Sequence, residues 1–541
     1  MSDYNNVYYD NRERLIDQLK EEFVRDAMRE CKYASEEAIR ESVVDVVRIL
    51  KEGENKSIEE LLEEIVSPYF TVLESIRSKY PVPGYDIGVS VGYGTEDDTA
   101  IPIDVQLYGG NIDGKGMHYD EESKLYVYND KELLLPNNAL FDLASITKLY
   151  TFIIAYNLLA DSSYNFSLDS KVKDLDDRFV NLGDVTIRQL LGFNVCIRTE
   201  TIAEKATDKD SAEKLLFAAT TFDNFEGLPE GGKIYEYSDM PMMVLKYVME
   251  RVTGKTYGEL VDRYIIKKLK LNDTHLIVPE SKVNLITGTP NRKLRRCNDP
   301  KANLVSVEKT KEFGNGAAGM FATGADLRKL MLNAHDLIPN GWFDNAYKPG
   351  SNMYQRVEKK EESYEPVPNT ELYKKVFVKN VRYNQVFHRG HLFGSSYTAY
   401  PTGTKVSFTS VNDPQKITKF QGSTRTEAGI TESSYGNSWF KTATTTLTNP
   451  CCMNLEIANK ISQELGKGVL VKSYFANGKE LYLVDARNMM PAKVMEGISD
   501  NILSSLRNSL ILFGYYAKLS NRISHDKGYS FSLGSNQRKR V

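Results

Sequence analysis

The chain opens on a block of helical periodicity. Between residues 11 and 78, apolar side chains recur three and four positions apart in three segments, which predicts amphipathic helices. Pro81 and Pro83 end this pattern. Two short β-like runs follow, DIGVSVGYG and IDVQLYGG, and they lead directly into a strongly apolar helix at residues 139–160.

The pattern changes twice along the rest of the chain. Residues 145 to about 332 are predicted to be mainly helical, and the segment MPMMVLKYVMERVTG ends at Gly254 as at a C-cap glycine. Residues 336–380 are polar, charged and aperiodic, which predicts a long surface excursion. Strand signals return at VFHRGHLFGSSYTAYP and TKVSFTSVND. A helix (LEIANKISQELG), a hairpin turning at Asn477-Gly478 and a long helix through 502–519 are then expected.

Strand signals on both sides of a helical block predict one mixed sheet assembled from distant segments. A length of 541 residues favours two or three structural units. The sequence shows no internal repeat.

Composition narrows the class of protein. A hydrophobic content of 41%, with 26% charged residues, is typical of a soluble globular protein, and a net charge of −4 gives no electrostatic case for nucleic-acid binding. The first residues lack the apolar core of a signal peptide, and the longest apolar runs are too short to span a bilayer, so no membrane partner is expected. Five scattered cysteines without a CxxC pair predict reduced thiols and a cytoplasmic protein.

One lysine in the apolar helix carries candidate chemistry. Lys148 lies one turn after Ser145, on the same helix face, and an unpaired buried ammonium is unfavourable. A serine hydroxyl needs a neighbouring base to act as a nucleophile, and a lysine serves if its surroundings lower its pKa. Asp142 and Ser145 offer N-cap chemistry, and N–H groups at a helix N-terminus suit an oxyanion. The alternative is a lysine whose ammonium simply reaches water.

The Ser-x-x-Lys spacing alone is not specific, because it also begins at five other serines: Ser170, Ser211, Ser306, Ser438 and Ser524. Two later stretches strengthen the case for Ser145. Tyr237-Ser238-Asp239 stands just ahead of a helix, and His388-Arg389-Gly390 lies on an expected strand.

Four linked motifs, FDLASITK, YSD…VTGKTY…LKLNDT, GAAGMFATGADLRKL and HRGHLFG…P…TSVNDP, resemble the serine β-lactamase-related family. That family includes class C β-lactamases, low-molecular-weight penicillin-binding proteins, D-aminopeptidases and family VIII-type esterases. The resemblance covers roughly residues 81–415, in the family's order. It implies an α/β (α+β) three-layer sandwich with a mostly antiparallel sheet and an inserted helical subdomain.

The resemblance also implies roles for single residues. Ser145 is the nucleophile and Lys148 its base or proton relay. Tyr237 is the second proton-transfer group. His388 and Gly390 match the third motif, and the oxyanion hole is formed by the backbone N–H groups of Ser145 and His391. The side chain of His391 is expected to be an ordinary packing or surface residue, since only its N–H is implied.

Two positions depart from the β-lactamase pattern. Asp239 stands where β-lactamases carry asparagine, and a carboxylate near Lys148 would favour its ammonium form, which shifts the role of base towards Tyr237 or a shared proton network. Alternatively, Asp239 simply caps the following helix. His388 replaces a lysine, so a permanent cation for a substrate carboxylate is lost, which favours esters or small amides.

The segment GNGAAG at residues 314–319 satisfies G-x-G-x-x-G but lacks the βαβ context of a dinucleotide site. We interpret it as a glycine-rich segment that lines the cleft. No cofactor and no metal site are expected, since the cysteines and histidines show no metal-ligand spacing.

The resemblance divides the chain into a helical extension (1–80), a β-lactamase-like catalytic domain (81–430, helical subdomain about 150–332) and a C-terminal α/β extension (431–541). The predicted function is a serine hydrolase that forms an acyl-enzyme with small esters or amides. One alternative is a D-amino-acid peptidase or muropeptide amidase, and another is a non-catalytic binding scaffold. The expected partner is a small ester, amide or peptide substrate, and the sequence leaves open whether the chain is a monomer or a homo-oligomer.

Overall fold

The structure is a computed structural model. It describes residues 2–30, 35–79, 84–95, 101–112, 117–128, 134–143, 146–192, 195–199, 209–221, 239–287, 316–317, 319–333, 337, 339, 355–366, 373–389, 405–409, 427–435, 438–448, 470–476, 479–485, 490–519 and 529–534.

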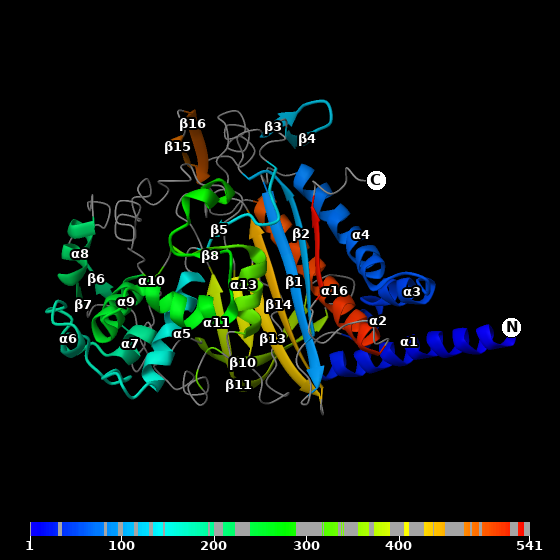
Figure 1. Ribbon diagram of the computed structural model, residues 1–541, viewed down its shortest axis with the longest axis horizontal. Helices are drawn as coiled ribbons and strands as arrows, with labels where there is room; N and C mark the ends of the chain where they lie inside the picture. Colours follow the sequence, from blue (N-terminus) through cyan, green and yellow to red (C-terminus); the bar gives the residue numbers. More distant parts are fainter. Residues whose placement is uncertain are drawn as a thin grey trace.

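A large mixed sheet forms the centre of the molecule, with helices on both of its faces (Figure 1). The strand order is β10-β11-β12-β13-β14-β1-β2-β17, so segments from both sides of the helical block are neighbours, as the sequence predicted. The ladders are antiparallel except for β12–β13 and β2–β17. The strands are β1 (Gly84–Thr95), β2 (Ile101–Gly110), β10 (Gln355–Pro366), β11 (Tyr373–Arg389), β12 (Lys405–Thr409), β13 (Glu427–Tyr435), β14 (Ser438–Thr448) and β17 (Tyr529–Gly534).

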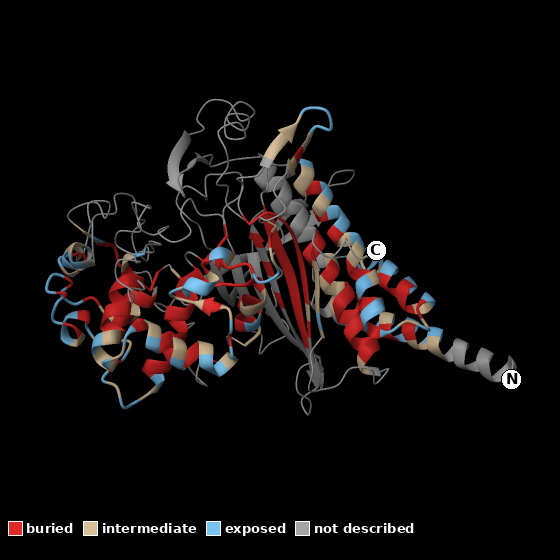
Figure 2. Ribbon diagram, turned by 45° about the horizontal axis from the view of Figure 1, so that its top comes forward, coloured by how far each residue is buried: buried red, intermediate tan, exposed pale blue. Residues whose placement is uncertain are grey.

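The outer face of the sheet is apolar. Strand residues alternate between faces, and on β1 and β2 one set is fully buried: Ile87, Val89, Val105 and Leu107. These side chains belong to one core with the N-terminal helices and α16, whose buried surfaces are red in Figure 2. The covering helices are α1 (Ser2–Glu30), α2 (Glu36–Glu41), α3 (Val44–Glu52), α4 (Ile58–Lys79) and α16 (Met490–Leu519).

The inner face of the same strands is polar at its centre. Arg328 of α13 (Gly324–Asn333) is completely buried against it. Its Nε and Nη2 donate to the two carboxylate oxygens of Asp104 at 2.7 and 2.9 Å, and Nη1 donates to Thr445 Oγ1 at 2.8 Å. Asp86 Oδ1 lies 3.8 Å from Nη1. A bidentate guanidinium pair satisfies charges that would otherwise be costly to bury, so Arg328 joins α13 to the sheet.

A block of helices packs beside α13, beyond this inner face. Helix α5 (Thr147–Ala160) runs through its centre and is buried up to Leu159, which explains why its sequence is apolar all round. Helix α9 (Met240–Thr253) ends at Gly254 in the left-handed conformation (φ 66°), as predicted. The other helices are α6 (Val172–Leu175), α7 (Ile187–Gly192), α8 (Lys209–Phe217), α10 (Tyr257–Val261), the π-turn η4 (Asp262–Ile266), α11 (Lys267–Leu269) and the 3₁₀ turn η5 (Glu280–Leu285).

Short strands connect these parts. A three-stranded sheet has the order β5-β9-β8, and three two-stranded sheets, β3-β4, β6-β7 and β15-β16, complete the described strands. The hairpin β15–β16 ends with the pair Ala476 and Lys479, and the predicted turn at Asn477-Gly478 lies outside the described residues. These strands are β3 (Met117–Asp120), β4 (Leu125–Tyr128), β5 (Phe141–Asp142), β6 (Ile197–Arg198), β7 (Thr220–Thr221), β8 (Thr274–His275), β9 (Phe321–Ala322), β15 (Leu470–Ala476) and β16 (Lys479–Asp485).

The structure corrects two predictions and adds three strands to the large sheet. Much of the expected excursion at 336–380 is strand, because β10 and β11 pair along their length. The charged sequence of β10 suits an edge strand, since charged residues prevent pairing with other chains. Helix α5 begins at Thr147 with Ile146 as N-cap and no side-chain cap, while Asp142 lies in β5. Strands β13, β14 and β17 were not predicted. The expected helix at 455–466 lies outside the described residues.

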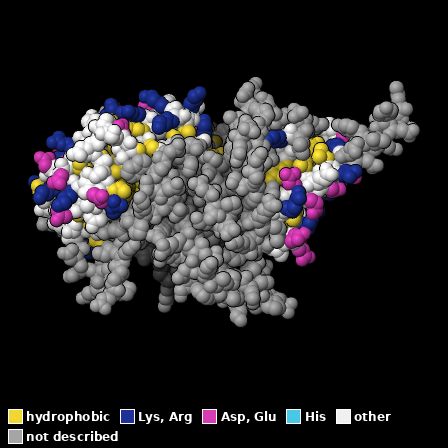
Figure 3. Space-filling view, turned by 90° about the horizontal axis from the view of Figure 1, so that it is seen from below, with side chains coloured by type: hydrophobic (Ala, Val, Ile, Leu, Met, Phe, Trp, Pro, Cys, Tyr) yellow, Lys and Arg dark blue, Asp and Glu magenta, His cyan; other side chains and the backbone are white. Residues whose placement is uncertain are grey.

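The described surface carries charges of both signs. In Figure 3, Lys and Arg side chains are interspersed with Asp and Glu over the helical block and the N-terminal helices, which agrees with the nearly balanced composition. Among the helices that the structure describes, none combines the length and the apolar character needed to cross a membrane.

Candidate active site

The residues before and after the N-terminus of α5 are hydrogen-bonded to one backbone segment. Strand β5 pairs with β9, and the Leu143 N–H donates to the Met320 carbonyl at 2.9 Å. The Met320 N–H in turn donates to Thr147 Oγ1 at 3.1 Å, in the first turn of α5. Residues on both sides of position 145 are therefore fixed to Met320, and the chain just before Met320 is brought to the side of α5.

Lys148 is the central side chain of this region. Its side chain is completely buried, and its Nζ lies 2.6 Å from Asp239 Oδ1. It also donates a hydrogen bond to the Ala317 carbonyl at 3.0 Å. Both partners are acceptors, and a carboxylate at this distance favours the ammonium form of the lysine. The alternative of a lysine that reaches water is therefore wrong.

Asp239 occupies the N-cap position of α9, yet its side chain makes no capping hydrogen bond. The carboxylate turns to Lys148 instead, which decides between the two roles considered for this residue in favour of the ion pair. About half of the Asp239 side chain remains exposed. The Asp239 carboxylate is thus paired with a buried ammonium while remaining accessible to solvent.

A second polar network lies one turn further along α5. Thr151 Oγ1 donates to the Gly316 carbonyl at 2.6 Å and lies 2.7 Å from the Tyr257 hydroxyl. Gly316 has a φ of 74°, and a Cβ there would lie 2.8 Å from both Lys246 Cβ and the Met242 carbonyl. The glycine is needed both for its backbone conformation and for close packing on α9. Gly316 and Ala317, from the GNGAAG segment, thus contact α5 at Thr151 and Lys148, and the role of this segment in lining a cleft stays a prediction.

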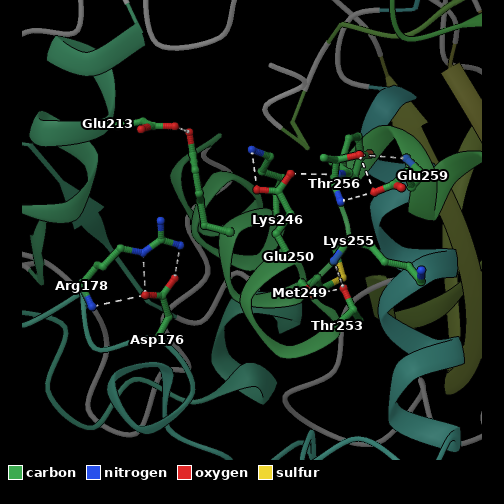
Figure 4. Close-up of polar contacts among 12 residues, drawn as sticks. Asp176, Arg178, Glu213, Lys246, Met249, Glu250, Thr253, Lys255, Thr256 and Glu259 are labelled. Carbon is green, nitrogen blue, oxygen red and sulfur yellow. Dashed lines mark hydrogen bonds and ion pairs between the residues drawn. The ribbon is translucent and has the colours of Figure 1, made fainter. Parts of the chain in front are cut away.

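Helix α9 carries a further ion pair behind this network (Figure 4). Lys246 Nζ lies 2.8 Å from Glu250 Oε2, and the other Glu250 oxygen accepts a 2.8 Å hydrogen bond from the Tyr257 N–H. Thr256 caps α10 in a reciprocal capping box with Glu259. These contacts fix the backbone at the first residue of α10, which is Tyr257.

The other predicted site residues are only partly placed. Ser145, Tyr237, Gly390 and His391 lie outside the described residues, and their roles stay predictions. His388 lies on β11, as the sequence predicted, where it pairs with Val406 of β12. Of the five predicted catalytic residues, the structure brings Lys148 and Asp239 together.

Sequence reasoning missed three contributors to this site. The Ala317 carbonyl is a backbone group, and the type of residue does not indicate that its backbone will act as an acceptor. Thr151 follows Lys148 by three positions on the same helix face, and this spacing was the available signal. Tyr257 lies more than a hundred residues away in the sequence, so its contact with Thr151 depends on the tertiary fold.

Comparison with known proteins gives the class of this chain. The family model described as Beta-lactamase matches residues 124–419, more than half of the chain. The chain belongs to the β-lactamase family, whose members are generally serine hydrolases. It has that family's fold, with helices on both faces of a mixed sheet.

Solved structures were compared as well. A class C β-lactamase from Rhodobacter sphaeroides is similar with a TM-score of 0.38 and 14% sequence identity, over 70% of this chain and 93% of that chain. No curated protein sequence matches this chain.

Proposed function

We propose that this protein hydrolyses small esters or amides through an acyl-enzyme formed on Ser145. The observation that carries the proposal is the environment of Lys148. A buried lysine, three residues after a serine at the start of a buried helix, is held between a carboxylate and a backbone carbonyl. An ion pair built only for stability has no need of this serine spacing, and the family resemblance assigns the acylated residue to Ser145.

The ion pair suggests how protons move. With Lys148 kept as an ammonium, the phenolate of Tyr237 is the proposed base. It takes the proton of the Ser145 hydroxyl while the serine oxygen attacks the substrate carbonyl. The oxyanion is stabilised by the N–H groups of Ser145 and His391. Tyr237 then gives the proton to the departing alcohol or amine. A water molecule releases the acyl group by the reverse sequence and regenerates the serine.

The charges near the site favour neutral acyl groups. Asp239 presents a half-exposed carboxylate beside Lys148, and His388 stands in place of a lysine. A substrate carboxylate would meet repulsion from Asp239 without a permanent cation to bind it. Neutral esters and small amides are therefore the proposed substrates.

The half-exposed carboxylate also favours one second candidate. A substrate with a free ammonium group could pair with Asp239, so a D-amino-acid peptidase or muropeptide amidase remains the alternative. We propose a cytoplasmic location for either activity. Turnover of D-Ala-containing peptides measured beside short p-nitrophenyl esters ranks the two.

The decisive test is covalent labelling. A fluorophosphonate probe is expected to add to Ser145, located by mass spectrometry, and Ser145→Ala is expected to lose both labelling and p-nitrophenyl ester turnover. Ser170→Ala is the matched control, because Ser170 also begins a Ser-x-x-Lys sequence but should leave both unchanged. Equal turnover by wild type and Ser145→Ala would refute the proposal, and a folded wild type that is never labelled would favour a binding scaffold.

A second variant tests the ion pair. Asp239→Asn keeps the shape of the side chain and removes the charge that favours the Lys148 ammonium. If that ammonium is required, the alkaline limb of the kcat/KM profile should move to lower pH by about one unit. An unchanged profile would contradict the proton path, while labelling of Ser145 would still support the hydrolase itself.

A further inference from the structure

The Lys148 ion pair and the Thr151 network are parts of one closed structure. Gly316 and Ala317 are consecutive residues, and both of their carbonyls accept hydrogen bonds from α5. Thr151 donates to the first at 2.6 Å, and Lys148 donates to the second at 3.0 Å. Since Lys148 and Thr151 are one turn apart on the same helix, the two hydrogen bonds and the backbone between them form a ring.

The direction of the hydrogen bonds follows from the chemistry of the groups. A carbonyl only accepts, so the single proton of the Thr151 hydroxyl is committed to Gly316. Thr151 Oγ1 and the Tyr257 hydroxyl are 2.7 Å apart, and the phenol must therefore be the donor between them. Burial raises the pKa of the Tyr257 phenol above its ordinary value, so the phenol keeps this proton at every working pH.

The phenol is held from a different part of the fold. Tyr257 is the first residue of α10, its N–H is bonded to Glu250 of α9, and its ring is completely buried. The 316–317 backbone is also pressed against α9, where a Cβ on Gly316 would have no room. The position of the Ala317 carbonyl is thus fixed jointly by α5, α9 and α10.

We propose that Thr151 and Tyr257 are positioning residues for acyl transfer: they hold the Gly316–Ala317 backbone so that the Ala317 carbonyl orients the Lys148 ammonium. The proposal rests on the proposed function. Neither side chain touches Lys148 in the hydrogen bonds described above, and both act through the backbone. Without the Thr151 hydroxyl, the Gly316 carbonyl loses a buried donor, and the segment is free to rotate its peptide groups away from Lys148.

The test compares four variants by their rate of labelling with a fluorophosphonate across pH. Thr151→Val removes the hydroxyl at nearly constant shape, Tyr257→Phe removes only the outer donor, and Thr151→Ser restores the hydroxyl. Tyr150→Phe is the control, because it removes a buried hydroxyl of the same helix that makes no hydrogen bond to Thr151, Tyr257 or Gly316. Melting temperatures of all variants are measured alongside.

Thr151→Val is expected to label about 10-fold more slowly than wild type, and Tyr257→Phe more slowly by a smaller factor, since small displacements at a reacting centre are amplified in the rate. Both should shift the pH profile of labelling. Thr151→Ser should recover the wild-type rate and profile, and Tyr150→Phe should keep both even if it melts at a lower temperature.

A purely structural role would lower the melting temperatures but leave rate and profile unchanged, and this result would overturn the proposal. If Thr151→Val does not fold, the pH profiles of labelling of Tyr257→Phe and Tyr150→Phe are compared instead. A shift in Tyr257→Phe alone would support the positioning role, and unchanged profiles in both would overturn it. The two proposals fail separately. If wild type is labelled and the variants label at the same rate, only the positioning role is refuted. If wild type is not labelled, both the acyl-enzyme and the positioning role are refuted.

Discussion

Asp86 is a carboxyl group buried on the inner face of the sheet, and its ionisation should weaken the fold at neutral pH. Desolvation raises the pKa of Asp86 to about 6, although Arg328 and a hydrogen bond from Gln106 act in the opposite direction. The folded protein therefore binds a proton that the unfolded chain, with an ordinary pKa of 3.8, does not hold. Stability contributed by this group rises as the pH falls through 6 towards 3.8 and is lost above 6.

The pKa difference sets the size of the effect. A shift from 3.8 to about 6 corresponds to about 3 kcal/mol in the free energy of unfolding, of which about 1 kcal/mol falls between pH 7 and pH 5. Asp86→Asn removes the titration and leaves an oxygen that can accept from Gln106. The free energy of unfolding of wild type should therefore rise by about 1 kcal/mol relative to this variant when the pH is lowered from 7 to 5.

Urea unfolding followed by far-UV circular dichroism at the two pH values measures this difference. Asp177→Asn is the control, since its side chain is exposed, and it should follow wild type at both pH values. The same pH dependence in wild type and Asp86→Asn would show that the charge of Arg328 compensates the desolvation of Asp86, and the reasoning would be wrong.

Three further substitutions test the packing of the fold by thermal and urea unfolding. Gly88→Ala would place its Cβ 1.9 Å from Arg328 Nη1 and should lower the free energy of unfolding by about 3 kcal/mol. An unchanged unfolding midpoint would mean that α13 moves away without loss of stability. Thr256→Ala removes the side-chain cap of α10 and should cost about 1 kcal/mol, with Thr256→Ser close to wild type. Leu506→Ala opens a cavity in the outer core and should cost about 2–5 kcal/mol, while labelling per folded molecule stays at the wild-type level.

Much of the fold could be predicted because the decisive patterns are local. Apolar periodicity marked the N-terminal helices, α5, α9 and α16, and a glycine marked the end of α9. The prediction of strands failed where the local sequence pattern was weak. The charged β10 has no apolar face to detect, and β17 is six residues long and depends on pairing with β2. Pairing between distant segments is a property of the tertiary fold.

The candidate site divides in the same way. Lys148 and Asp239 carry charges, and a charged side chain beside an apolar helix stands out in a sequence. The hydroxyl of Thr151 and the carbonyl of Ala317 do not, because threonine and alanine are ordinary core residues. The buried position of Arg328 was also missed, since an arginine on a helix is normally exposed and its partners come from β1, β2 and β14.

The order of strands in the sheet has a consequence during synthesis on the ribosome. Strands β1 and β2 emerge early, but their outer face is covered by α16, and their neighbours β14 and β17 are translated more than three hundred residues later. Until then the nascent chain exposes an apolar surface and unpaired strand edges, which are prone to aggregate. The large sheet can therefore be completed only after residue 534 has been synthesised, because β17 pairs with β2.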